Sequence, residues 1–252
     1  LLDALDERDL ADETYVFFCS DNGGATHNRA RDPFYQRYLR GEDPGPPEGR
    51  IPPNVPLRGS KQWVYEGGIR VPFVVRGPGV EAGSLCREPV YTVDFLRTFY
   101  RLTGGRDPLP EEIDGGSLEP LLAQRGEVRR AEPGLAFHRP LLRFRKGTPI
   151  PHMGMTGFRQ GDWKLVVDWV EDRRELYNLR EDIGEQRDLA AERPETTEQM
   201  FRDLTGYLQT VDAEPVQAQL GAAGDRTAQW ITKPARIEHL KSLAEKALRQ
   251  GE

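Results

Sequence analysis

Residues 14–19, TYVFFC, form a nearly unbroken apolar run with the length of one β-strand. Strands that are buried on both faces, as in the middle of a parallel sheet, have this composition. A second run, IRVPFVV at residues 69–75, contains Pro72, which favours an edge strand or an irregular strand end. Helical patterns precede the first run and follow the second, so the chain is predicted to have an α/β fold with a parallel sheet covered by helices on both faces.

The helix predicted after the second strand lies in TVDFLRTFYRLTGG, residues 92–105. Thr92 is its expected N-cap and Gly104 its expected stop. The face that is expected to cover the sheet comprises Val93, Leu96, Phe99 and Tyr100.

Beyond about residue 126 the pattern changes to short strands and turns. The segments MTGFRQ, WKLVVDWV and RELYNL predict a small antiparallel sheet, with EDRR as the reversal between the last two. A helix that packs on this sheet is predicted from about Pro194, because apolar residues recur at helical spacing: Met200, Phe201, Leu204, Tyr207, Leu208 and Val211. The tail has one more amphipathic stretch, with Ile237, Leu240, Ala244, Ala247 and Leu248 on one face. The predicted division is thus an α/β part at residues 1–125, a small-sheet part at 126–213 and a helical tail of unknown role at 214–252.

Composition excludes several kinds of partner. The chain has 252 residues and a net charge of -6, with 30% charged residues, so it lacks the basic stripe of a nucleic-acid binder. No apolar run approaches the roughly 18 residues that span a bilayer, and the opening LLDALDERDL is typical of an amphipathic helix, not of a signal peptide. Cys19 and Cys86 are too few for a disulfide framework, and Cys19 is expected to be a reduced, packed thiol. These features indicate neither a compartment nor an oligomeric state.

Asp21 and Asn22 follow the first apolar run after one intervening residue, Ser20. Asn-Gly after a strand is a turn signal, so a purely structural corner is one interpretation. The other is a metal site, because ligands collect at the carboxyl ends of strands in parallel α/β sheets. A carboxylate and an amide carbonyl are hard oxygen donors that suit calcium or magnesium.

Lys61 lies in PLRGSKQWVYEGGIRVPF, residues 56–73. Taken alone it is a solvated loop lysine. Beside a metal corner, a lysine on a glycine-rich loop can instead place its ammonium against a bound oxyanion and offset negative charge that develops during displacement.

Five motifs, in order, resemble the C-terminal half of a type I sulfatase: FFCSDNGG, PLRGSKQWVYEGGIRVPFVVRGPG, DGGSLEPLL, RQGDWKLVVDW and ELYNLREDIGEQRDLA. The resemblance covers about residues 1–212. These formylglycine-dependent enzymes belong to the alkaline phosphatase-like superfamily, and the resemblance implies a mixed-sheet α/β domain covered by helices and followed by a small antiparallel sheet with a packed helix.

The resemblance also implies roles for individual residues. Asp21 and Asn22 look like two ligands of the single active-site calcium, and Lys61 looks like the lysine that contacts the substrate sulfate. FHRP resembles a histidine-containing turn of the family, so His138 is expected to approach the substrate unless it is a packed or solvated histidine. His27 and His152 are weaker candidates.

The chain departs from the family pattern at two places. The signature Cys- or Ser-x-Pro-x-Arg, whose first residue becomes formylglycine, is absent, and so is the first, Asp-rich part of the metal site. Because the chain also starts with Leu1 inside a helical pattern, it is expected to be the downstream part of a longer protein. The upstream part is expected to supply the formylglycine and a secretory signal for a periplasmic or secreted enzyme, and this chain alone is expected to be inactive.

Several alternatives stay open at this point. A phosphatase, phosphodiesterase or phosphonate hydrolase of the same superfamily is the nearest, although two-zinc members need histidine where Asn22 stands. A non-catalytic calcium-binding or interaction module is another. The expected substrate is a sulfated carbohydrate, ahead of an aryl sulfate; basic loop residues that could meet further anionic groups, or be solvated, are Arg29, Arg31, Arg37, Arg40, Arg143, Arg145 and Lys146.

Overall fold

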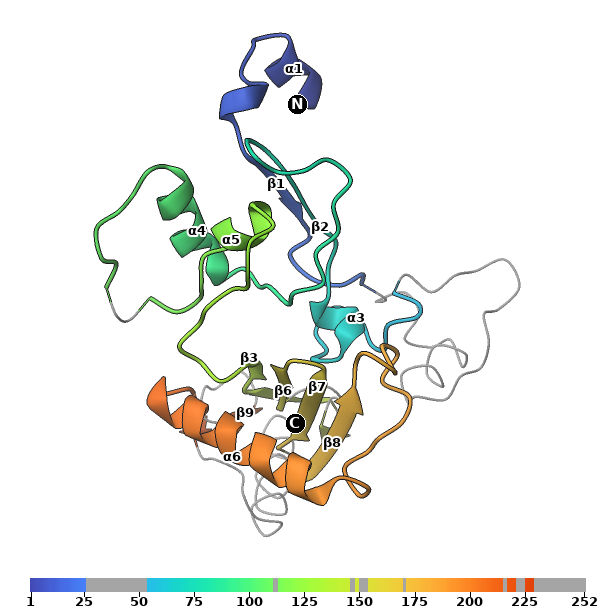
Figure 1. Ribbon diagram of the computed structural model, residues 1–252. Coiled ribbons are helices and arrows are strands. Elements are labelled where there is room, and N and C mark those ends of the chain that lie inside the picture. The colour runs from blue at the N-terminus through green and yellow to red at the C-terminus, as the bar shows by residue number, and fades with distance from the viewer. Residues whose placement is uncertain are drawn as a thin grey trace. The chain divides into compact units, whose positions relative to one another are not determined.

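The structure is a computed structural model that describes residues 1–25, 54–110, 113–145, 148–149, 154–169, 171–214, 217–220 and 225–228 (Figure 1). These residues divide into two compact units. The first unit comprises Leu1–Asp21 and Pro72–Pro133, and the second comprises Asn22–Val71 and Gly134–Glu252. The loop that holds Lys61 therefore belongs to the same unit as the C-terminal sheet. The boundaries predicted at residues 125 and 213 stay predictions.

The first unit contains a two-stranded sheet of β1 (Val16–Cys19) and β2 (Phe73–Arg76). Both strands form where the apolar runs predict them, and Pro72 lies just before β2. The expectation that they run parallel is wrong, because β1 and β2 pair antiparallel, with Val16 opposite Arg76 and Cys19 opposite Phe73. Continuous apolar composition carries no information on strand direction, which explains the error. The predicted burial on both faces is also not seen in the described residues, because Phe18 and Val74 on the other face of the pair are exposed.

Four phenylalanine rings join this sheet to α4 (Asp94–Leu102). The ring of Phe17 on β1 contacts those of Phe95 and Phe99 at centroid distances of 6.0 and 4.9 Å. Phe73 on β2 stacks on Phe95 at 5.7 Å. Such aromatic pairs stabilise packing beyond the area that they bury. The helix therefore covers one face of the pair, as the sequence predicts.

The buried side of α4 nevertheless differs from the predicted one. Val93, Leu96 and Phe99 are exposed, whereas Asp94 and Thr98 are fully buried. Asp94 accepts hydrogen bonds from the backbone N–H of Gly116 at 2.8 Å and from the guanidinium of Arg130 at 2.6 and 2.9 Å. These bonds turn the polar side of the helix inward, which amphipathicity alone does not anticipate.

The helix ends close to the predicted positions. α4 stops at Leu102, and Gly104 follows with a φ of 91°, a left-handed conformation that suits glycine at a helix end. At the other end Val93, not Thr92, occupies the cap position, without a side-chain cap. Short elements complete the described helices: α1 (Leu2–Asp6), a 3₁₀ turn η1 (Ala11–Glu13), α3 (Glu66–Ile69) and α5 (Glu119–Leu122).

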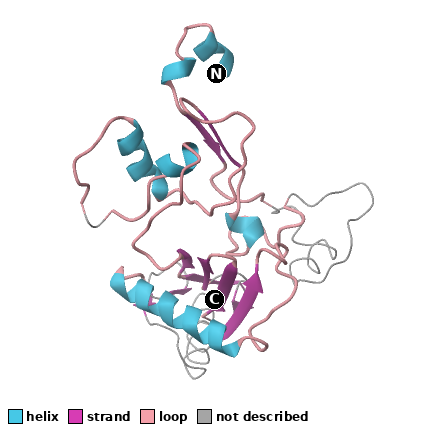
Figure 2. Ribbon diagram, in the orientation of Figure 1, coloured by secondary structure: helices cyan, strands magenta, loops and turns pink. Residues whose placement is uncertain are grey.

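The second unit is built on the predicted antiparallel sheet (Figure 2). Its strands are β3 (Leu135–Arg139), β6 (Met155–Gln160), β7 (Trp163–Asp168) and β8 (Arg173–Asn178), in the order β3-β6-β7-β8. All three pairings are antiparallel. The predicted antiparallel sheet is confirmed for this part. The reversal predicted at EDRR is confined to its first two residues, because Arg173 and Arg174 already belong to β8.

The two faces of this sheet are covered by different segments. Helix α6 (Pro194–Thr210) crosses one face, where Leu204 packs with Leu165 and Val167 of β7 (Figure 1). On the other face Val166 packs with Val64 and Tyr65, which belong to the segment after Lys61. Because side chains alternate along a strand, Lys164 lies on the same face as Val166. The Lys61 segment is therefore attached to the sheet opposite α6.

A second four-stranded sheet contains β4 (Leu141–Arg145), β5 (Thr148–Pro149), β9 (Gln217–Leu220) and β10 (Asp225–Ala228), in the order β10-β9-β4-β5. The sequence did not predict strands in the tail. The amphipathic stretch predicted around residues 237–248, the arginines at 29–40, Lys146, His27 and His152 lie outside the described residues. Within the described ranges, none of the helices has the length and apolar character that a bilayer crossing requires.

Replacing Leu204 with alanine is expected to lower the free energy of unfolding by about 2–5 kcal/mol, because the side chain is fully buried between α6 and the sheet. Gln209 is exposed on the same helix, and Gln209→Ala is the matched control, with a change within about 0.5 kcal/mol. Denaturant unfolding followed by circular dichroism measures both. Equal effects of the two substitutions would contradict the packing of α6 described above.

Candidate functional site

Asp21 and Asn22 lie immediately beyond the end of β1, as the sequence predicts. Asp21 is exposed and is the last residue of the first unit in this stretch, and Asn22 is the first residue of the second. The amide nitrogen Nδ2 of Asn22 donates a hydrogen bond to the carbonyl of Gly23 at 3.0 Å, which fixes the orientation of the side chain. The two candidate metal ligands are thus consecutive residues at a strand end.

The segment after Asn22 is hydrogen-bonded to the Lys61 loop. The N–H of Gly23 donates to the carbonyl of Gly68 at 3.0 Å, and the N–H of Lys61 donates to the carbonyl of Gly24 at 3.1 Å. Asn54 reinforces this contact, since its side chain accepts a bond from Gly24 N–H at 2.9 Å and donates to the Gly24 carbonyl at 3.1 Å. The DNGG motif and the Lys61 loop, which are far apart in the sequence, are therefore joined by backbone hydrogen bonds.

Glycines make this approach possible. A Cβ atom on Gly23 would lie 1.8 Å from the carbonyl oxygen of Gly67, and one on Gly68 would lie 2.2 Å from that of Trp63. Both distances are far shorter than any van der Waals contact, so no larger residue fits. Close backbone packing therefore explains Gly23 of DNGG and both glycines of EGG.

Lys61 sits in a tight turn that Trp63 N–H closes by donating to the Ser60 carbonyl at 2.9 Å. Gln62 has a φ of 84°, a left-handed conformation that is uncommon outside glycine. The guanidinium of Arg139 on β3 donates a hydrogen bond to the Gln62 carbonyl. Lys61 itself is half-buried. A strained residue held by a neighbouring strand is typical of functional loops.

A buried ionic cluster, formed by Lys164, Glu66 and Glu185, ties the end of this loop to the sheet. The ammonium of Lys164, which is fully buried, lies 2.9 Å from Oε1 of Glu66 and 2.8 Å from Oε1 of Glu185. Oε2 of Glu185 accepts the backbone N–H of Glu66 at 2.7 Å. Lys164 on β7 and Glu185 in the segment after β8 thus hold Glu66, the first residue of α3.

The two carboxylates of this cluster differ in protonation. Burial is the largest effect on both, and it raises the pKa of Glu185 to about 7. For Glu66, burial acts in the same direction, but Lys164, then Arg159 and Arg70, lower the pKa below its ordinary value. Among the described residues no donor makes an aligned hydrogen bond to Oε1 of Glu185. Glu66 therefore carries the charge that pairs with Lys164.

Arg58 provides a second attachment at the beginning of the loop. Its guanidinium lies 3.9 Å from the centre of the Tyr65 ring and donates to the Tyr177 hydroxyl at 2.7 Å. Both tyrosines donate to Oε2 of Glu175, at 2.6 Å from Tyr65 and 2.8 Å from Tyr177. Burial and then the charge of Glu175 raise the pKa of both phenols, which therefore remain protonated donors.

His138 on β3 has hydrogen bonds at both ring nitrogens. Its Nδ1 lies 2.7 Å from the Thr156 hydroxyl oxygen, which also accepts the indole N–H of Trp169 at 2.7 Å. Its Nε2 lies 2.7 Å from the carbonyl oxygen of Glu214. Because Nε2 must donate to that carbonyl, Nδ1 accepts from Thr156. Burial lowers the pKa of His138, with partial opposition from Glu214. These bonds favour the packed-histidine alternative, and a substrate contact stays a prediction.

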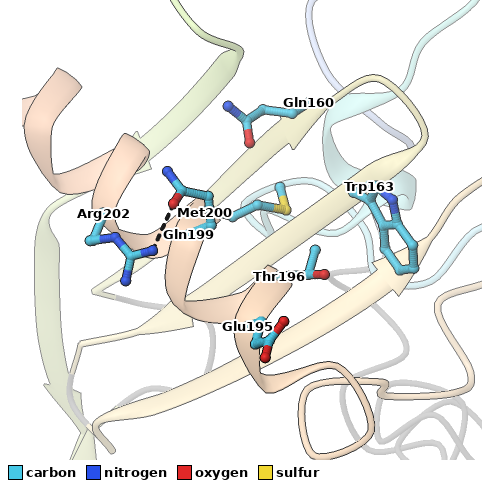
Figure 3. A pocket seen from close by; sticks show the side chains of 7 residues that line it. All are labelled: Gln160, Trp163, Glu195, Thr196, Gln199, Met200 and Arg202. Carbon is cyan, nitrogen blue, oxygen red and sulfur yellow. Dashed lines mark hydrogen bonds between the residues drawn. The ribbon is translucent and has the colours of Figure 1, made fainter.

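A hollow of about 460 Å³ lies elsewhere in the second unit, between the β6–β7 hairpin and the first turns of α6 (Figure 3). Its lining combines polar side chains with the apolar surface of Trp163 and Met200, and Arg202 donates to Oε1 of Gln199 at 2.6 Å along α6. The lining residues are Gln160, Trp163, Glu195, Thr196, Gln199, Met200 and Arg202. None of them belongs to the Lys61 loop.

Sequence reasoning missed the residues that hold the loop. Lys164, Glu185 and Arg139 lie in motifs quoted in the sequence analysis, but those motifs indicated no role for them, and Asn54 lies in none. The residues that these side chains contact are distant in the sequence. One signal was available, since Lys164 interrupts an apolar strand at a position where a lysine is rarely buried without a partner.

Replacing Glu185 with glutamine is expected to change the pH dependence of stability. Folded Glu185 keeps its proton up to about pH 7, whereas an unfolded glutamate loses it near pH 4.3, so this group makes folding less favourable as pH rises through that window. The melting temperature of Glu185→Gln minus that of the parent should therefore increase from about pH 5 to about pH 8. Glu181 is exposed, and Glu181→Gln should give a nearly constant difference. A constant difference for Glu185→Gln as well would contradict the assigned protonation.

Family models match both parts of the chain. The model described as Sulfatase matches residues 1–105, and the model described as N-sulphoglucosamine sulphohydrolase, C-terminal, matches residues 59–214.

Individual proteins agree with these matches. The chain is 32% identical to a sulfatase from Formosa agariphila over 192 residues, which are 73% of this chain and 30% of that protein. It is 40% identical to steryl-sulfatase from Mus musculus over 139 residues, 55% of this chain and 20% of that protein. The chain thus spans less than a third of the length of these relatives.

A solved structure with a similar fold is that of BT4656 in complex with its substrate D-glucosamine-2-N,6-O-disulfate. It superposes with a TM-score of 0.59 at 22% identity, over 84% of this chain and 37% of that one. This similarity supports the predicted alkaline phosphatase-like α/β fold. Since one family model matches residues 59–214 and another matches residues 1–105, the chain belongs to the sulfatase family.

Proposed function

We propose that the whole protein hydrolyses sulfuric esters and that its substrate is a sulfated carbohydrate. Membership of the sulfatase family supports the reaction. The substrate class is supported by BT4656, a structural neighbour with a sulfated glucosamine as its substrate. Steryl-sulfatase is also a relative, so a sulfated sterol or aryl ester is the second candidate class. The relatives compared above are sulfatases, which favours a sulfate ester over the phosphate esters of the wider superfamily.

The observation that carries this proposal is the attachment of the Lys61 turn to the segment after Asn22. Two backbone hydrogen bonds, from Gly23 to Gly68 and from Lys61 to Gly24, join the predicted sulfate-contacting lysine to the predicted metal corner. In the proposed reaction the Lys61 ammonium lies against the sulfate oxygens. It stabilises the charge that shifts during displacement, and it is preorganised because its turn is fixed by neighbouring strands.

Asp21 and Asn22 are proposed to hold a calcium ion, with magnesium as the second choice. The donor types fit, because a carboxylate and an amide oxygen are the hard ligands that calcium prefers. The number does not suffice, since calcium takes about six to eight oxygens. In the ranges that the structure describes, no cluster of three or more His, Cys, Asp or Glu residues could hold a metal. The remaining ligands are assigned to other parts of the protein, and the ion would supply positive charge at the sulfate oxygens.

The nucleophile is proposed to be a formylglycine outside this chain, because these 252 residues contain no Cys- or Ser-x-Pro-x-Arg. What this chain contributes to the reaction is binding and orientation of the sulfate group. A periplasmic or secreted location is proposed on the resemblance to the family.

Replacing Lys61 with alanine in the full-length protein is expected to lower kcat roughly 10²- to 10³-fold, since it removes one preorganised charge from the transition state. Steady-state hydrolysis of a sulfate ester at saturating calcium measures this change. Arg180 is a highly exposed cation in the same unit, and Arg180→Ala, which removes the same charge, is the control with parental activity. Activity of Lys61→Ala within about twofold of the parent would return Lys61 to the solvated-loop interpretation.

A further inference from the structure

We propose that Lys164 is a positioning residue of the sulfatase, which acts through Glu66 and Glu185 to hold the Lys61 turn in its working geometry. The inference rests on the proposed function of Lys61. Lys164 is on β7, separated from Lys61 by more than a hundred residues of sequence, and it is fully buried. It therefore cannot meet the substrate itself.

The connection from Lys164 to Lys61 runs through a short, fully bonded path. Lys164 binds the Glu66 carboxylate, while Glu185 binds the Glu66 backbone N–H, so this residue is held at both its side chain and its main chain. The next residue, Gly67, donates from its N–H to the Arg58 carbonyl at 2.6 Å. That bond closes the loop on which Lys61 lies. Loss of the clamp at Glu66 would release the part of the loop that follows Lys61, whereas Arg58 keeps its own bond to Tyr177 at the beginning of the loop.

The charge pattern is better explained by orientation than by stability. Two carboxylates surround one buried ammonium, and burial of ions is expensive even when they are paired. Packed apolar side chains in the same volume are often as stabilising. An ion cluster, in contrast, fixes direction, because the ammonium and the carboxylates accept only a narrow set of distances and angles. A carboxyl group at Glu185 that keeps its proton lets the cluster remain neutral as a whole.

The hydrogen bond from Arg139 to Gln62 adds a third attachment, at the residue directly after Lys61. It holds the turn from β3, whereas Lys164 on β7 holds Glu66 at the start of α3. The strained φ of Gln62 persists only if its surroundings enforce it. The antiparallel sheet thus holds the Lys61 loop in place through several contacts. The buried cluster of Lys164, Glu66 and Glu185 is the most deeply buried of these contacts.

The test uses the full-length protein with Lys164→Met, which keeps the length of the side chain and removes its charge. Because this change leaves the charged carboxylate of Glu66 without its buried cation, a second variant, Lys164→Met with Glu66→Gln, removes the surplus charge and protects folding. Val167→Ala is the matched control, since Val167 is buried on the same strand but faces α6. All variants are compared with and without Lys61→Ala.

Two readouts are measured. Hydrogen–deuterium exchange in peptides covering residues 58–68 should rise at least about tenfold in both Lys164 variants, whereas the peptide of α6 should stay protected. In the same variants kcat should fall about 10- to 100-fold with KM within about threefold, because misplacement of about 1 Å affects the transition state most. In the Lys61→Ala background the Lys164 substitutions should have an effect of less than about threefold, since they act through Lys61.

Three results would overturn the inference. The first is a kcat of the double variant equal to that of the parent. The second is hydrogen–deuterium exchange of the loop in the Lys164 variants that is no faster than in Val167→Ala. The third is an effect of Lys164→Met on kcat that is as large in the Lys61→Ala background as in the parent. A different result separates the two proposals: the Lys164 variants exchange faster in the loop, but the parent protein hydrolyses no sulfate ester. That result would overturn the proposed function and leave the structural part of the inference supported.

Discussion

The buried ammonium of Lys164 is the deepest ionic connection between the Lys61 loop and the antiparallel sheet of the second unit. It lies between Glu66 and Glu185 at 2.9 and 2.8 Å, and these residues come from the Lys61 loop and from the segment after β8. The sheet below it is stabilised independently by α6 and its apolar side chains. The loop above it has only a short helix of its own, α3, so its shape depends on contacts with the sheet. The position of Lys61 is therefore a consequence of burial and charge pairing more than 90 residues away in the sequence.

Glycines and backbone hydrogen bonds connect the anchored residue, Glu66, to the candidate site around Lys61. With Glu66 fixed, Gly67 and Gly68 bring their backbones within contact of Gly59, Trp63 and Gly23, at distances that a Cβ atom would forbid. The result is a dense backbone layer that ends in the turn carrying Lys61. Polar groups that are held this way need little reorganisation during a reaction, which is the property required of a group that stabilises developing charge.

The sequence allowed the elements with strong periodicity to be predicted, and not the interactions between distant polar residues. Strands β6, β7 and β8 and helix α6 were predicted because alternation and helical spacing are local signals. The parallel arrangement of β1 and β2 was predicted wrongly, since an apolar run does not encode direction. The buried side of α4 was also wrong, because the bonds of Asp94 to Arg130 and Gly116 outweigh the apolar pattern. Lys61 and the Asp21–Asn22 corner are predicted from motifs and stay predictions, whereas the contacts of Lys164, Asn54 and Arg139 become visible only in the fold.

The central claim is that this chain places the Lys61 ammonium at a sulfate group beside a calcium ion held by Asp21 and Asn22. A crystal structure of the full-length protein with calcium and a bound sulfate ester tests it most directly. The account predicts side-chain oxygens of Asp21 and Asn22 at about 2.3–2.6 Å from calcium and Lys61 Nζ at about 2.7–2.9 Å from a sulfate oxygen. Calcium coordinated without these two residues, or Lys61 directed into solvent while the sulfate is bound, would contradict it.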